Sequence, residues 1–161
     1  MIHAVLAVTL FAGRPGLEPL YRSARSYDRA SFRFAPPTED RLRSTRALVT
    51  ELVRALRPGA PPAALVAAAR AAGWTLEEAQ DPAGQLWVLR EPDGQREGAG
   101  FFAFRARGAP ACVQAPHTFF DEGTGEIALA LFARLHGGAL FVNTVHRYAP
   151  SGAGEHAADG A

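Results

Sequence analysis

The feature that most constrains the fold is a strand–helix–strand pattern in the last third of the chain. Residues 111–115 and 139–145 are short strand-like segments, and residues 124–135 between them have helical spacing. Three such elements within 35 residues are typical of a βαβ unit, whose strands are expected to run parallel with a right-handed crossover. We expect the helix to pack across both strands through its apolar stripe. The stripe consists of Ile127, Leu131, Phe132 and Leu135.

Strand-like segments separated by turn sequences precede this unit. They cover residues 74–78, 86–90 and 100–105, with Asp-Pro-Ala-Gly and Glu-Pro-Asp-Gly between them. This pattern predicts an antiparallel meander that runs on into residues 111–115. Cys112 lies inside that last segment and is expected to be a buried, unreactive thiol.

Two helices are predicted before the meander. The first begins after Thr38, a favourable N-cap followed by two acids, and ends before a Pro-Gly pair at position 58. The second opens on two prolines at position 61 and runs through an alanine-rich segment to Gly73. In the first helix we expect the arginines to face solvent, opposite an apolar face. That face consists of Leu42, Val49, Leu52, Val53 and Leu56.

The ends of the chain are less regular. Proline and glycine punctuate residues 14–37, which predicts an irregular stretch. The apolar run at residues 4–12 fits a buried strand or the core of a signal peptide. The first alternative favours a cytoplasmic protein, and the second implies a secreted or periplasmic one. Residues 149–161 are rich in Gly and Ala and are expected to form a disordered tail.

Together these patterns predict one α/β domain over residues 1–148. Its parts are a mixed sheet with a C-terminal parallel βαβ unit, an antiparallel meander and two N-terminal helices. The length of 161 residues is that of a single domain, and no apolar run reaches the ~20 residues that span a bilayer.

Composition excludes several kinds of chemistry. All 17 basic residues are arginine, so mechanisms that need a P-loop, Schiff-base or kinase lysine are excluded. The net charge of +1 argues against a nucleic acid or an anionic membrane as partner. A single cysteine excludes an internal disulfide framework. The expected partner is a small molecule or peptide, and the oligomeric state stays open.

Two histidines follow the strands of the predicted βαβ unit. His117 comes just after residues 111–115, and His146 just after residues 139–145. The carboxyl ends of neighbouring parallel strands form a ligand-binding crevice in open α/β sheets. Asp121 lies in the loop that follows His117. Two imidazoles and a carboxylate are the ligand set of a hydrolytic zinc site, which predicts His117, Asp121 and His146 as metal ligands. The alternative for His117 is a loop histidine that is hydrogen-bonded to backbone.

Further side chains near this crevice suit the hydrolysis of an amide. Glu122 and Glu126 are candidates for the general base. Asn143 is a candidate donor to a developing oxyanion, and Arg147 is a candidate for binding a substrate carboxylate. His136, at the end of the predicted helix, is expected to compensate the helix dipole.

The same residues carry a resemblance to a known group of enzymes. The segments Ala-Pro-His at 115–117, Asp-Glu-Gly-Thr at 121–124 and Val-Asn-Thr-Val-His-Arg at 142–147 resemble zinc-dependent amidohydrolases and exopeptidases. The most similar patterns are those of poly-gamma-glutamate hydrolases, N-formylglutamate amidohydrolases and N-acetylmuramoyl-alanine amidases. The resemblance covers residues 111–147 and implies a metal-ligand role for His117 and for Asp121.

The resulting hypothesis is a zinc-dependent hydrolase that cleaves an amide in a small acidic substrate, such as an acyl-amino acid or a peptide. The alternative is a non-catalytic or degenerate α/β domain that acts as a binding or interaction module.

Overall fold

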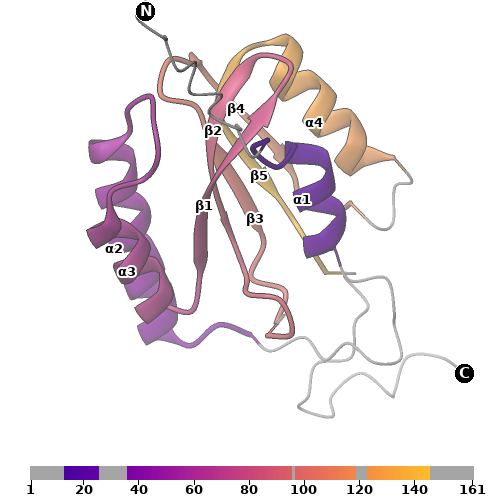
Figure 1. The fold of residues 1–161 in the computed structure, drawn as a ribbon. Helices are drawn as coiled ribbons and strands as arrows, with labels where there is room; N and C mark the ends of the chain where they lie inside the picture. The colour runs from indigo at the N-terminus through magenta and orange to yellow at the C-terminus, as the bar shows by residue number, and fades with distance from the viewer. Residues whose placement is uncertain (1–12, 26–35, 96, 119–122, 146–161) are drawn as a thin grey trace, which may run out of the picture.

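The fold is a mixed sheet with helices on both faces (Figure 1). It is given by a computed structural model, which describes residues 13–25, 36–95, 97–118 and 123–145. This arrangement confirms the predicted α/β class. No helix in the described ranges is long and apolar enough to cross a membrane. In chain order the elements are α1 (Leu17–Ala24), α2 (Glu39–Ala55), α3 (Ala63–Ala71), β1 (Thr75–Asp81), β2 (Gly84–Arg90), β3 (Phe101–Phe104), β4 (Ala109–Ala115), α4 (Thr124–Arg134) and β5 (Gly137–Val142).

The sheet has the strand order β1-β2-β3-β5-β4. β1, β2 and β3 form an antiparallel meander, and the predicted Asp-Pro-Ala-Gly turn joins the first two strands. β5 pairs parallel with β4, so β4, α4 and β5 form the predicted βαβ unit. The meander itself ends at β3, because β5 occupies the place beside β3 and leaves β4 at the edge of the sheet.

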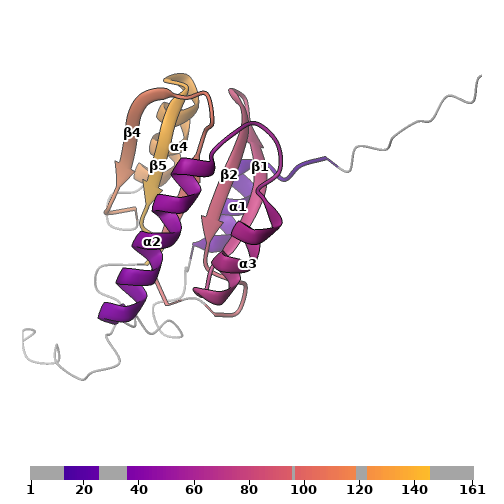
Figure 2. The same cartoon turned by 90° about the vertical axis from the view of Figure 1, so that its left-hand side faces the viewer.

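An apolar core lies on each face of the sheet. Figure 1 shows α1 and α4 on one face and α2 and α3 on the other, and in Figure 2 the latter pair lies in front of the sheet. The core under α1 and α4 includes Tyr21 and Phe132, and the core under α2 and α3 includes Trp74 and Trp87. The sheet is therefore buried from both sides over its central strands.

Helix α1 lies inside the region that proline and glycine predict to be irregular, so that prediction is wrong there. Gly16 is the N-cap, and Pro19 lies in the first turn, where its missing N–H removes no helical hydrogen bond. The helix is stable because four apolar residues at helical spacing are buried against the sheet. They are Leu17, Leu20, Tyr21 and Ala24.

Helix α4 packs across β4 and β5 as predicted, but through a different face. The buried residues are Gly125, Ala128, Leu129 and Phe132. Of the predicted stripe only Phe132 is buried, whereas Ile127, Leu131 and Leu135 are exposed by 59%, 46% and 53%. The small Gly125 permits this rotation, because a Cβ at that position would overlap the Tyr21 hydroxyl of α1.

The buried face of α2 also differs from the predicted one. Leu48 and Leu52 are buried, while Leu42 and Val53 are exposed by 49% and 53%. Arg41 does not face solvent as predicted: its guanidinium forms an ion pair with the buried Glu91.

Cys112 is exposed, which corrects the prediction of a buried thiol. The side chains of β4 alternate between a partly buried and an exposed face, and Cys112 lies on the exposed one. The reason is the edge position of β4, where the covering helices α2 and α3 do not extend.

Candidate ligand-binding site

The residues that follow β4 and β5 are hydrogen-bonded to each other. The Asn143 N–H donates to the Ala115 carbonyl at 3.0 Å, and the Thr118 hydroxyl donates to the Asn143 carbonyl at 2.7 Å. His117 lies in the turn between these bonds and is exposed. The carboxyl ends of the two parallel strands therefore meet at one end of the sheet, with His117 beside them.

Asn143, the predicted oxyanion donor, has both amide hydrogens engaged by backbone. Its Nδ2 donates to the Pro116 carbonyl at 2.9 Å and to the Val145 carbonyl at 2.8 Å. Its Oδ1 accepts from the Val145 N–H at 3.1 Å. In this conformation the side chain holds the turn after β5 against the turn after β4, and an oxyanion could bind only if one of these bonds broke.

Glu126, a predicted general base, lies in the first turn of α4 and faces α1. Its Oε1 accepts from Arg25 Nη1 at 2.7 Å, and the same guanidinium donates to the Thr118 carbonyl at 3.3 Å. The other oxygen, Oε2, is buried and has no hydrogen-bond partner among the described residues. Glu126 thus joins α4 to the end of α1.

The other predicted site residues lie outside the described residues. They are Asp121, Glu122, His146 and Arg147. Within the described ranges no three His, Cys, Asp or Glu side chains are close enough to hold a metal ion. The zinc site therefore stays a prediction, with His117 the one predicted ligand that the structure describes.

One buried carboxylate lies at this same end of the sheet, just after β2. Glu91 is 3% exposed and accepts from the N–H groups of Glu97 and Gly98 at 2.9 and 3.0 Å. Burial raises the pKa of the Glu91 carboxyl, against the opposing effects of the Ala99 and Gly98 N–H groups and of Arg41. Since its oxygens are occupied by these donors, Glu91 holds the β2–β3 connection to α2.

The cavity at this end of the sheet is poor in charge. It has a volume of about 280 Å³, and its polar side chains are those of Gln114 and Asn143. No ionisable side chain lines it among the described residues.

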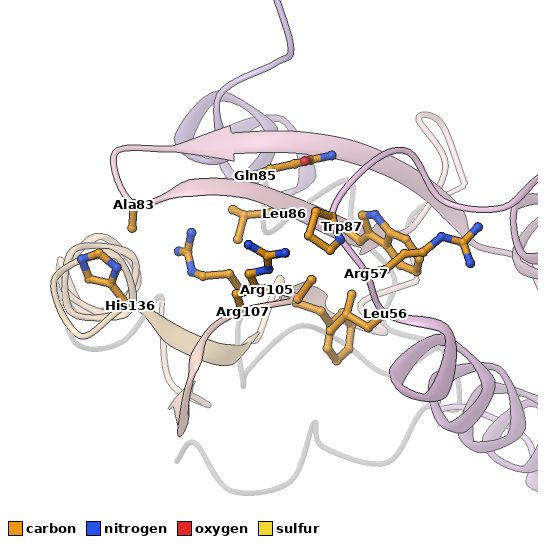
Figure 3. A pocket seen from close by; sticks show the side chains of 12 residues that line it. Leu56, Arg57, Ala83, Gln85, Leu86, Trp87, Arg105, Arg107 and His136 are labelled. Atoms are coloured by element: carbon orange, nitrogen blue, oxygen red, sulfur yellow. The ribbon is translucent and has the colours of Figure 1, made fainter.

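A cationic pocket lies at the opposite end of the sheet. It occupies about 240 Å³ between the start of β2, the β3–β4 loop, the turn before β5 and the segment after α2. Its polar side chains are Arg57, Arg105, Arg107, His136 and Gln85, and no Asp or Glu of the described residues lines it. Figure 3 shows His136 at one end of the pocket and Arg57 at the other, with Arg105 and Arg107 between them.

The wall that carries Arg57 is fixed to the sheet through one glycine. The Trp87 indole N–H donates to the Gly59 carbonyl at 2.6 Å, and the Gly59 N–H donates to Gln85 Oε1 at 3.1 Å. Gly59 has a φ of 112°, a conformation that side-chain-bearing residues rarely adopt. The segment after α2 is consequently held in place over the start of β2.

Arg105 forms the floor of the pocket and is neutralised. It makes two parallel bonds to the Asp81 carboxylate, at 3.0 and 2.6 Å, and both side chains are about 5% exposed or less. Its Nε donates to the Gly137 carbonyl at 3.3 Å, and the guanidinium lies 4.9 Å from the centre of the Phe132 ring. This floor connects the β1–β2 hairpin, the β3–β4 loop and α4.

The remaining wall is formed where two backbone turns meet. A Cβ at Gly108 would lie 2.5 Å from the Gly138 Cα, so only glycine permits this approach. The Ala109 N–H donates to the His136 carbonyl at 2.7 Å. His136 follows the C-cap of α4 in a left-handed conformation, with φ of 50°, at a position where glycine is the usual residue. The arrangement directs Arg107 and His136 to the same opening.

The charge of the pocket is uncompensated around its rim. Arg57, Arg107 and His136 line it, and none forms an ion pair with a described residue. Two guanidinium groups and an imidazole thus surround an apolar interior lined by Leu56, Leu86 and Phe104. Such a site suits a small molecule with an oxyanion group, since guanidinium groups bind carboxylate and phosphate through paired hydrogen bonds.

The sequence predicts His136 only as a helix-end residue and does not identify the arginines of this pocket. Residues 105–107 read Arg-Ala-Arg, which puts two guanidinium groups near one turn. No local signal links that turn to Arg57, which lies 48 positions before Arg105.

Comparisons with protein-family models, with curated proteins and with solved structures gave no match to this chain.

Proposed function

We propose that this chain is a non-catalytic binding module that takes a small organic oxyanion in the pocket of Arg57, Arg107 and His136. The observation that carries the proposal is the uncompensated cationic rim over an apolar interior, with no acidic residue among the described residues of the lining. The pocket volume of about 240 Å³ limits the ligand to a small molecule. A phosphate monoester or carboxylate on an apolar or aromatic group has this combination of charge and size.

The neutral floor supports this assignment. Asp81 already satisfies Arg105, so that guanidinium shapes the pocket without competing for the ligand. The rim guanidinium groups lack such a partner among the described residues. A ligand oxyanion would supply the charge-assisted hydrogen bonds that these groups otherwise make to water.

Titration calorimetry with phenyl phosphate and with inorganic phosphate tests the proposal. We expect the wild-type chain to bind phenyl phosphate more tightly, because the phenyl group adds burial in the apolar interior. Arg107→Gln should weaken binding by roughly tenfold or more, the loss expected for one charge-assisted hydrogen bond. Arg54→Gln is the matched control, since Arg54 lies on α2 with its side chain 74% exposed.

Two outcomes would contradict the proposal. One is a wild-type chain that binds neither anion. The other is an equal loss of binding in the Arg107 and Arg54 variants, which would indicate a general effect of net charge.

The second candidate function is the zinc-dependent amide hydrolase that the sequence predicts. The observation that favours it is the hydrogen bonding between the segments that follow the parallel strands β4 and β5. The first segment carries His117, and the second precedes His146 in the sequence. In this hypothesis Asp121 completes the ligand set, and Arg147 binds the substrate carboxylate.

Metal analysis of protein purified without chelators tests this candidate. The hypothesis expects about one zinc per chain, lost in His117→Ala together with hydrolysis of N-acyl-glutamates, because three-ligand sites tolerate no loss. Arg147→Ala should mainly raise KM. A wild-type chain without metal and without turnover would leave the binding module as the remaining function.

A further inference from the structure

The cationic side chains of the proposed binding pocket lie in two separate places. Figure 3 shows Arg57 at one end of the pocket and His136 at the other. Arg107, the third member of the rim, comes from the turn beside His136. All three side chains are exposed, and none forms an ion pair with a described residue. A ligand with a single oxyanion group would therefore neutralise one end of the pocket and leave the other end unpaired.

The end that carries His136 offers two kinds of hydrogen-bond donor. The Ala109 N–H donates to the His136 carbonyl at 2.7 Å, and a Cβ at Gly108 would lie 2.5 Å from the Gly138 Cα. These contacts hold the turn of Arg107 against the turn of His136. A guanidinium and an imidazole both donate N–H groups, and a phosphate group has three oxygens that accept them. This end consequently suits the phosphate group of a ligand.

The other end offers one guanidinium on a fixed wall. Arg57 lies two residues before Gly59, whose carbonyl accepts from the Trp87 indole N–H at 2.6 Å. Trp87 pairs with Phe104 in the sheet, so this wall stands over the strands, whereas Arg107 lies three residues beyond Phe104. A single guanidinium matches the geometry of a carboxylate, which it binds through two parallel hydrogen bonds.

The surface between the two ends carries no uncompensated charge. Leu56, Leu86 and Phe104 line it, and the Arg105 guanidinium of the floor is paired with the Asp81 carboxylate. An apolar group placed there leaves water without contacting an unpaired charge. The pocket volume of about 240 Å³ is below the range of drug-sized ligands, which leaves room for about one ring.

We infer that the ligand carries two acidic groups at opposite ends of one apolar ring, with a phosphate at Arg107 and His136 and a carboxylate at Arg57. This inference rests on the proposed function, because it names the ligand class of the same pocket. A ligand with one acidic group occupies one end only and binds more weakly. A ligand whose two acidic groups are adjacent on the ring also reaches one end only.

Titration calorimetry of the wild-type chain with three substituted phenyl phosphates tests the inference. The first, 4-carboxyphenyl phosphate, has its acidic groups at opposite ends of the ring. The second, 2-carboxyphenyl phosphate, is an isomer with the same groups side by side. The third, 4-carbamoylphenyl phosphate, has a neutral amide in place of the carboxylate. We expect the first ligand to bind roughly fivefold more tightly than either of the others, the upper range for one further ion pair at an exposed site.

Two variants assign this gain to one residue. Arg57→Gln should remove the advantage of 4-carboxyphenyl phosphate over 4-carbamoylphenyl phosphate. Arg54→Gln is the matched control, because it loses the same charge one helical turn earlier, from a side chain that is 74% exposed and does not line the pocket. The control variant should keep the advantage. Arg107→Gln should weaken the binding of all three ligands, since it lies at the phosphate end.

The failure of this inference can be distinguished from the failure of the proposed function. A wild-type chain that binds none of the three phosphates would overturn both. If the phosphates bind and Arg107→Gln weakens them, the proposed function stands, and equal affinities for 4-carboxyphenyl and 4-carbamoylphenyl phosphate would overturn the inference alone. An advantage that survives Arg57→Gln, that Arg54→Gln also removes, or that 2-carboxyphenyl phosphate shares would overturn it too. Each of these three results would mean that total charge, rather than the placement of Arg57, decides the affinity.

Discussion

His136 has a backbone conformation that its residue type does not favour. A left-handed conformation costs a residue with a Cβ about 1–2 kcal/mol, and glycine is the usual choice after a helix C-cap. His136 nevertheless lies there with φ of 50°, on the rim of the cationic pocket. Backbone strain at such a position is consistent with a functional side chain that is retained at a cost in stability.

Replacement of His136 by glycine should therefore separate stability from binding. We expect His136→Gly to raise the free energy of unfolding by about 0.5–1 kcal/mol, the relieved strain less the extra entropy of the unfolded chain. The same variant should bind phenyl phosphate more weakly. Urea denaturation and calorimetry on one preparation measure both effects, and a variant that loses stability would contradict the assignment.

Glu91 predicts an unusual dependence of stability on pH. Burial raises the pKa of its carboxyl in the folded state above the ordinary value of 4.5. The folded chain therefore binds more protons than the unfolded chain between these two pKa values, and this residue's contribution to stability falls as pH rises through that window. Most paired carboxylates act in the opposite sense.

Urea denaturation of the wild type and of Glu91→Gln across the acidic range up to neutral pH isolates this contribution. As pH rises, the unfolding free energy of the wild type should fall relative to that of Glu91→Gln. This change with pH is expected whichever protein is the more stable at the acidic end. Parallel curves across the range would mean that burial does not raise the pKa of this carboxyl.

At the scale of elements, one ion pair joins parts that are distant in sequence. Arg105, just after β3, is held by Asp81 at the end of β1, and both are nearly inaccessible to water. The pair fixes the hairpin, the β3–β4 loop and α4 around the floor of the pocket. A buried charge that loses its partner is strongly unfavourable, whereas loss of both charges costs less.

Arg105→Met should lower the free energy of unfolding by about 3–5 kcal/mol, because it leaves the Asp81 carboxylate buried without its cation. The double variant Arg105→Met with Asp81→Asn should be more stable than Arg105→Met alone. Denaturant unfolding of the wild type, the two single variants and the double variant measures the coupling. Strictly additive effects would show that the two side chains do not interact.

At the scale of the whole molecule, the loops and turns that connect the strands hold both ends of the sheet together. The end that carries His117 is held by Asn143 and Thr118, and the other end is held by close contacts between backbone turns.

Gly108→Ala tests the contacts between the backbone turns, since its Cβ would lie 2.7 Å from the Gly137 carbonyl oxygen. We expect a loss of about 1–3 kcal/mol in the free energy of unfolding. Gly13→Ala, with no atom within 4 Å of the added Cβ, should be neutral.

Several features of the fold follow from local sequence. Thr38 accepts a hydrogen bond from the Arg41 N–H at 3.2 Å as the predicted N-cap, and the Asp-Pro-Ala-Gly turn closes the first hairpin. The parallel pairing of β4 and β5 was predictable because a helix of this length between two short strands has one common solution. The cap and the turn are decided by residues near one another in the chain, and the strand pairing is decided by the single helix that connects the two strands.

The tertiary structure alone decided which faces are buried and which side chains meet. Periodicity located α4, but its buried face depends on Tyr21 packing against Gly125, a contact across 104 positions. Arg57 and Arg107 share a pocket because Gly59 is bonded to β2, which no local pattern encodes. Local propensity sets elements and turns, whereas contacts between distant segments set the buried face of α4 and the cationic pocket, because burial is a property of the whole packed chain.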